Sequence, residues 1–147
     1  MATTTFSGPV KAGSVREGAS ANVGFVLMAQ SANVVFGANG TETVVATLPA
    51  NSQIYQIAVD VTTAFDAGTT NTFDIGDGST ADQYADALAV GSAARVLATS
   101  DVSQIPNLID IGSSDVNVTV TYNQTGTAAT AGAATVTVLY LQNNNLS

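Results

Sequence analysis

The sequence predicts an all-β protein, built as an antiparallel β-sandwich, from two observations. Short segments with an apolar residue at every second position recur along the chain, and Gly, Asn, Asp and Pro residues separate them. There is also no regular alternation of strands with long helices, which a parallel sheet would require. About eight or nine short strands are expected, and a jelly roll is the leading topology for such a sandwich.

The clearest strand patterns lie in the middle and at the end of the chain. In residues 54–63, and again in 116–122 and 134–140, apolar side chains alternate with Thr, Asn, Gln and other small or polar side chains. A strand directs alternate side chains to opposite faces, so each segment would bury one face. Leu139 and Leu141 lie on the face opposite the valines of the last segment. This places the last strand in the centre of a sheet or at an interface.

Turn signals between these segments suggest how the strands connect. Asn39-Gly40 stands between residues 33–36 and 43–48 and predicts a tight turn. Residues 54–75 are expected to form one hairpin, and 116–140 a second hairpin with a long loop.

One short helix is expected at residues 79–89. Ser79 precedes Asp82 by three residues, a spacing close to that of a capping box. The residues that then recur at helical spacing are Ala81, Tyr84, Ala85 and Leu88. The pattern predicts about two turns of helix.

The charges divide the chain into two parts. Residues 1–20 hold two cations and one acid, a net of +1, whereas residues 21–147 hold ten acids and one arginine, a net of −9. Glycine and proline also disfavour regular structure near the start. We therefore expect an extended N-terminal arm at 1–20 and a β-sandwich domain at 21–147. A frayed terminus is the alternative interpretation of the arm. The residues expected to contact a neighbouring subunit of an assembly are Phe6, Pro9, Val10, Lys11 and Arg16.

The composition argues against an enzyme. The chain has no His and no Cys, which excludes Ser–His–Asp and Cys–His nucleophilic schemes. The densest carboxylates are Asp74, Asp77, Asp82 and Asp86. Such a cluster could hold a hard cation, but its spacing does not match an EF-hand loop. An acidic turn followed by a capped helix is the favoured interpretation, so no catalytic residue, metal or cofactor is expected.

The surface chemistry narrows the possible partners. Only 10% of the residues are charged, against about 25% in an average domain, and the net charge is −8. Three cations are too few for binding nucleic acid, and no segment is long and apolar enough to suggest a membrane span. The start of the chain also lacks the features of a secretory signal. An exterior of uncharged polar residues favours a protein that works in an assembly over an ordinary soluble domain.

Three segments resemble the capsid decoration (cement) proteins of tailed bacteriophages: residues 2–11, 46–77 and 110–138. The resemblance implies a β-sandwich that binds the outer surface of an icosahedral capsid, assembles in the host cytoplasm and has no catalytic residues. The implied partners are the major capsid protein and further copies of the same chain, with a homotrimer favoured. A head-fibre or tail-associated module that binds a receptor or carbohydrate is the alternative. The absence of Trp weighs against stacking on sugars.

Overall fold

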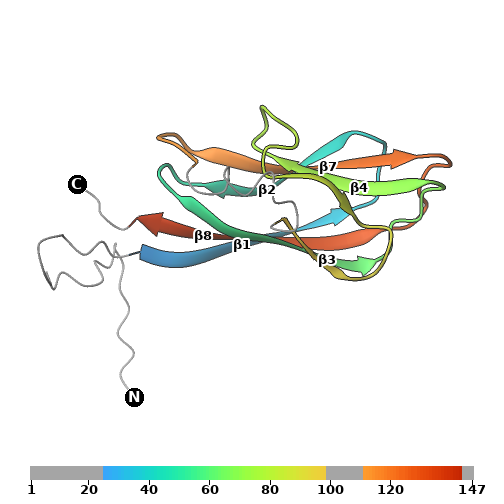
Figure 1. The fold of residues 1–147 in the computed structure, drawn as a ribbon, viewed down its shortest axis with the longest axis horizontal. Coiled ribbons are helices and arrows are strands. Elements are labelled where there is room, and N and C mark those ends of the chain that lie inside the picture. The colour runs from blue at the N-terminus through green and yellow to red at the C-terminus, as the bar shows by residue number, and fades with distance from the viewer. Residues whose placement is uncertain (1–24, 99–110, 144–147) are drawn as a thin grey trace, which may run out of the picture.

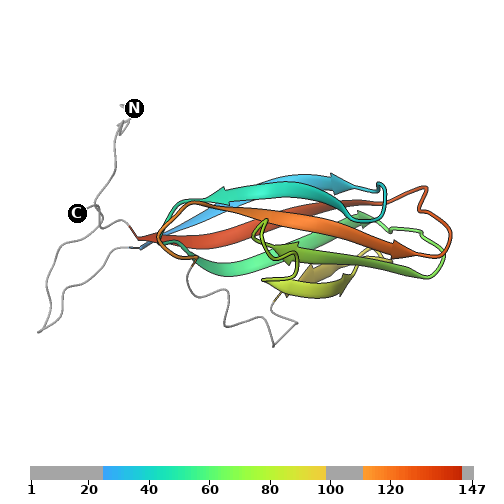
Figure 2. The same ribbon diagram turned by 90° about the horizontal axis from the view of Figure 1, so that it is seen from above.

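The computed structural model describes residues 25–98 and 111–143, which form two four-stranded antiparallel sheets packed face to face (Figures 1 and 2). Sheet A has the strand order β1-β8-β3-β6, and sheet B has the order β2-β7-β4-β5. This confirms the predicted antiparallel sandwich. The strands are β1 (Phe25–Val35), β2 (Thr41–Leu48), β3 (Gln53–Thr63), β4 (Thr70–Gly76), β5 (Ala85–Ala89), β6 (Arg95–Leu97), β7 (Val116–Thr125) and β8 (Ala133–Asn143).

The strand pairs are nested, which identifies the topology. β1 pairs with β8, β2 with β7, β3 with β6 and β4 with β5, all antiparallel. The chain therefore resembles one long hairpin whose two arms are rolled together into two sheets. This is the strand order of a jelly roll, so the leading topology is confirmed. The predicted arm lies outside the described residues, and its boundary with the domain stays a prediction.

The predicted hairpins are wrong. β3 and β4 belong to different sheets, and so do β7 and β8, so neither 54–75 nor 116–140 forms a hairpin. The tight turn at Asn39-Gly40 is present, with Gly40 at φ 78°. However, this turn carries the chain from β1 in sheet A to β2 in sheet B. The last strand lies between β1 and β3, which confirms its predicted place in a sheet centre.

The predicted helix at 79–89 is also wrong, because this segment is a turn followed by strand β5. Ala85 and Leu88 are buried, while the two residues between them are exposed. Ala87 adopts a positive φ of 49°, and the register between β4 and β5 shifts at this point. A bulge adds one residue to the spacing between inward side chains. The spacing of three residues therefore imitated the period of a helix.

The core fills the space between the two sheets. At its centre, the ring centroids of Phe65 and Phe73 are 5.0 Å apart, and those of Phe65 and Tyr122 are 4.9 Å apart. The Tyr122 hydroxyl donates a hydrogen bond to Asn71 Oδ1 at 2.6 Å, so its polar end is satisfied. Gly132 approaches this cluster closely, since a Cβ there would lie 2.4 Å from Phe65 Cδ1.

A glutamine side chain joins the two sheets along one side of the sandwich. Gln30 on β1 donates from Nε2 to the carbonyl of Thr47 at 2.7 Å and accepts at Oε1 from the Thr47 backbone N–H at 3.0 Å. The same Nε2 lies 3.1 Å from the Tyr140 hydroxyl and donates to it. Backbone groups of β2 that face away from β7 are thereby satisfied by a side chain of the other sheet.

Candidate interaction surfaces

The two outer faces of the sandwich differ in charge. Six described acids lie on the sheet B side, on its strands or the loops beside them: Glu42, Asp74, Asp77, Asp82, Asp86 and Asp115. On the strands of sheet A the described charged side chains are Asp60 and Arg95, which pair with each other, and Asp66 lies in the loop that joins β3 of this sheet to β4 of sheet B. The contact joins Arg95 Nε to Asp60 Oδ1 at 2.6 Å and Nη2 to Oδ2 at 2.9 Å. These hydrogen bonds from Arg95 lower the pKa of the Asp60 carboxyl. Sheet A thus presents a neutral face and sheet B an acidic one.

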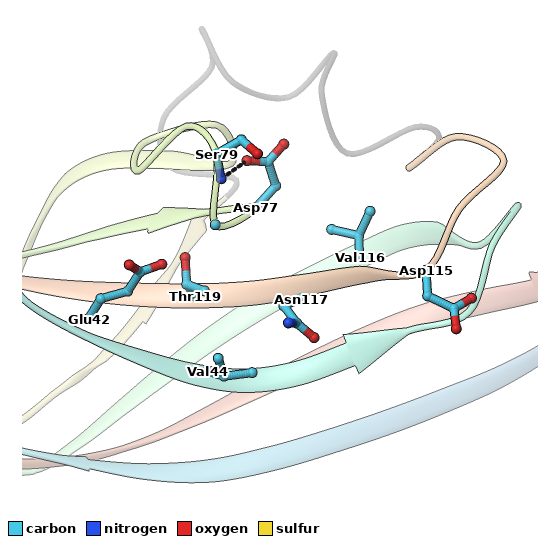
Figure 3. Close-up of a pocket in the computed structure, with 9 residues that line it drawn as sticks. Glu42, Val44, Asp77, Ser79, Asp115, Val116, Asn117 and Thr119 are labelled. Atoms are coloured by element: carbon cyan, nitrogen blue, oxygen red, sulfur yellow. Dashed lines mark hydrogen bonds between the residues drawn. The ribbon is translucent and has the colours of Figure 1, made fainter.

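A shallow depression lies on the acidic face, between β2, β7 and the turn that follows β4 (Figure 3). Its volume is about 570 Å³. The residues that line it are Glu42, Val44, Asp77, Gly78, Ser79, Asp115, Val116, Asn117 and Thr119. Its chemistry is acidic and polar, and none of these side chains is aromatic.

Two of the three carboxylates in this depression accept hydrogen bonds from nearby backbone N–H groups. Asp77 Oδ1 accepts hydrogen bonds from the backbone N–H groups of Ser79 at 2.8 Å and Thr80 at 2.7 Å. Asp115 Oδ1 accepts from the backbone N–H of Ala50 at 2.9 Å. This arrangement confirms the acidic turn predicted at Asp77, although no helix follows it.

Asp74, another carboxylate of the candidate cation cluster, also accepts hydrogen bonds from neighbouring groups. Asp74 Oδ1 accepts from the backbone N–H of Ala87 at 2.9 Å, and its Oδ2 accepts from Asn123 Nδ2 at 2.5 Å. Within residues 25–98 and 111–143, no three acidic, His or Cys side chains are grouped so that they could hold a metal ion. In the same ranges, no helix is long and apolar enough to cross a membrane.

Tyr84 is expected to make the fold less stable at alkaline pH. Its side chain is only 3% exposed, and burial, helped by the charge of Asp77, raises the pKa of its phenol from 10.0 to about 12. Between these pH values the unfolded chain loses the proton while the folded chain keeps it. Stability from the neutral phenol is therefore complete below pH 10 and is lost as the pH rises towards 12.

We expect the free energy of unfolding to fall by about 2 to 3 kcal/mol across this interval because of Tyr84. Urea denaturation at a series of pH values would measure the fall. Tyr84→Phe removes the titrating group and should flatten the profile. If the variant lost as much stability as the parent over the same interval, another group would be responsible.

Five of the seven exposed large hydrophobic side chains that the structure describes lie on one strand or directly after it. The seven are Val26, Leu27, Met28, Val35, Phe36, Val44 and Tyr55. The first five belong to β1 or to the residue that directly follows it. β1 is also an edge strand of sheet A, with β8 on its other side (Figure 1).

The predicted contact residues Phe6, Pro9, Val10, Lys11 and Arg16 lie outside the described residues, so their placement stays a prediction. The sequence analysis did not identify the exposed side chains of β1. The apolar run at 23–29 predicts a strand, but strand periodicity does not show which of its side chains remain exposed.

No family model matches the chain, and no curated protein sequence matches it. Solved structures do. A chain of the cyanophage Pam1 capsid asymmetric unit is similar with a TM-score of 0.61 at 17% identity, over 89% of this chain and 94% of that one. A chain of the capsid of Ralstonia phage GP4 gives 0.61 at 22% identity, over 80% and 85%. A chain of the acidic stable capsid of Helicobacter pylori bacteriophage KHP30 gives 0.52 at 15% identity, over 82% and 94%. The fold of this chain therefore occurs in the capsid structures of three phages.

Proposed function

We propose that this protein is a structural component of a phage particle that binds the outer surface of the capsid and stabilises it. The observation that carries the proposal is the fold similarity to chains of phage capsid structures. In the Pam1 comparison it extends over 89% of this chain and 94% of the other, so it involves whole domains. The major capsid protein is the proposed partner, together with further copies of this chain, with a trimer favoured.

The charge distribution suggests how the protein would be oriented on the capsid. The neutral outer face of sheet A has little electrostatic cost of desolvation, because its described charges form a single exposed pair, Asp60 and Arg95. The acidic face of sheet B would then point to solvent, where like charges are screened. Attachment would rely on apolar burial and backbone hydrogen bonds, because exposed ion pairs contribute at most about 1 kcal/mol each.

The N-terminal arm is proposed as a second contact. Phe6, Pro9 and Val10 would supply apolar contact, and Lys11 and Arg16 are two of the three cations of the chain. Many identical weak contacts across an oligomer add through multivalency, so the arm need not bind tightly by itself.

A tail-associated or head-fibre module that binds a receptor or carbohydrate is the second candidate. The depression on sheet B could accept a ligand, but it has no aromatic side chain on which a sugar ring could stack. This makes the capsid role the better supported one.

Two experiments test the proposal. Electron microscopy of native particles should show copies distributed over the outer capsid surface, whereas a few copies at the tail tip would favour the receptor-binding role.

In co-sedimentation with capsids that lack the protein, the full chain should bind and should stay bound at moderate salt. A variant lacking residues 2–16 should keep its circular dichroism spectrum and bind more weakly. Equal binding by this variant would show that the arm is only a frayed terminus.

A further inference from the structure

Three of the four edge strands of the sandwich are protected against pairing with another chain. β6 has three residues and β5 has five, with a register shift beside it. β2 has a bulge between Val44 and Ala46, and Gln30 occupies the backbone N–H and carbonyl of Thr47. Short edge strands, bulges and covered backbone groups are the usual means by which sheet proteins avoid edge-to-edge association.

The fourth edge strand, β1, lacks these protections. Its 11 residues pair with β8 in continuous register from Phe25 to Val35, without a bulge. The strand contains no charged residue and no proline. Within the ranges that the structure describes, no segment pairs with its free side. A long, uncharged and regular edge presents a row of free backbone donors and acceptors to another strand.

Exposed apolar side chains stand at both ends of β1, and the exposed residues between them include the polar Ser31 and Asn33. Leu27 is 54% exposed and Val35 is 65% exposed, and Val26, Met28 and Phe36 are each exposed by about two-fifths. Leu27 stands opposite Leu141 in the register of β1 with β8, so the apolar surface continues onto the next strand. Exposed apolar surface that is concentrated in this way marks a contact surface rather than scattered exposure.

We propose that β1 is the surface through which copies of this chain associate, with the β1 edge of one copy against the β1 edge of another. Two arguments favour a second copy as the occupant. A free strand edge is best satisfied by another free edge, and every copy supplies one. In addition, residues 21–147 carry a net charge of −9, and two such bodies repel unless they meet where charge is absent.

The position of the edge agrees with this occupant. β8 separates β1 from Asp60 on β3, and β8 and β3 separate it from Arg95 on β6. An 11-residue strand is about 37 Å long, so pairing of two β1 strands gives a long contact that is free of charge.

The inference concerns the isolated protein and does not depend on capsid binding. Analytical ultracentrifugation of the full chain at about 100 μM should show a dimer, because each copy supplies one β1 edge and pairing closes at two copies. The test variant is Leu27→Lys combined with Val35→Lys, because an edge lysine opposes strand pairing. We expect this variant to associate at least tenfold more weakly than the full chain. It should be mainly monomeric at the same concentration.

A matched control comes from the two exposed hydrophobics outside β1. Val44 is 54% exposed and Tyr55 is 63% exposed, close to the values for Leu27 and Val35. Val44→Lys combined with Tyr55→Lys adds the same charge and should leave the oligomer intact. Circular dichroism and thermal melting would confirm that both double variants fold.

Hydrogen exchange gives an independent measurement. Amides on the free side of β1 should exchange more slowly in the full chain than in the Leu27→Lys, Val35→Lys variant. A full chain that stays monomeric at this concentration, or a β1 variant that associates as tightly as its parent, would overturn the inference. Capsid binding of the same variants would be measured separately by co-sedimentation. A failure to bind capsids would therefore not affect the conclusion about association through β1.

Discussion

Gly76→Ala is expected to cost more than about 4 kcal/mol of folding free energy, which is a large part of the stability of an average domain. Gly76 is buried at the end of β4, where the next turn folds back over it. A Cβ at this position would lie 1.9 Å from the carbonyl oxygen of Thr80 and 2.6 Å from the carbonyl carbon of Ala81. Both are backbone atoms, so no side-chain rotation relieves the overlap.

The turn has little freedom to move away from Gly76. Asp77 accepts backbone hydrogen bonds from Ser79 and Thr80, and the Asp77 N–H donates to the Thr80 carbonyl at 3.2 Å. Displacing Thr80 would break these contacts as a group. Chemical denaturation followed by circular dichroism would measure the loss of stability.

Gly37→Ala is the control for this substitution. A Cβ at Gly37 would meet Thr41 Oγ1 at 3.5 Å, which is ordinary van der Waals contact. We expect a change of less than about 1 kcal/mol. If Gly76→Ala were as stable as Gly37→Ala, the turn could not be seated on β4 as described.

Phe73→Ala is expected to destabilise the protein by about 3 to 5 kcal/mol. The Phe73 ring is fully buried on β4, 5.0 Å from the Phe65 ring and 6.0 Å from the Tyr122 ring. Its loss removes apolar burial, leaves a cavity between the sheets and breaks two edge-to-face contacts, which contribute about 0.5 to 1.5 kcal/mol each. The midpoint of urea unfolding would show the effect.

Tyr55→Ala removes an aromatic side chain of similar size from an exposed position. Because Tyr55 is 63% exposed, we expect its removal to change stability by less than about 1 kcal/mol. A similar loss in the two variants would mean that the three rings do not form the centre of the core.

The strands could be predicted because alternation reports burial directly. Residues 54–63, 116–122 and 134–140 all lie in strands that bury the face expected from their pattern, with one exception. Tyr55 was expected on the buried face but is 63% exposed, because the register of β3 with β8 shifts between Ile54 and Gln56. The partners of these strands could not be predicted in the same way. A strand that buries one face has the same pattern whether its neighbour in sequence lies beside it or across the core, and this is why both hairpins were wrong.

The helix and the exposed edge show two further limits. Between Ala85 and Leu88 a bulge changed the spacing of buried residues. The sequence contains no glycine there that would have indicated a bulge. At β1 the apolar run identifies a strand, but its exposure depends on β8 covering one side and nothing described covering the other. This exposure depends on the pairing of β1 with β8, two strands that lie more than a hundred residues apart in the sequence.

The nested strand pairs also govern when the chain can fold. Sheet A has β8 between β1 and β3, so it cannot close until the last strand, Ala133–Asn143, has left the ribosome. Every earlier strand of that sheet must wait for it with its backbone unpaired on at least one side. Pairings between distant segments form slowly, in milliseconds to seconds for all-β domains, because the loop must close before the contacts form. The sandwich therefore cannot be completed before Ala133–Asn143 has been synthesised, and the uncharged β1 strand is the segment most exposed to wrong partners in that interval.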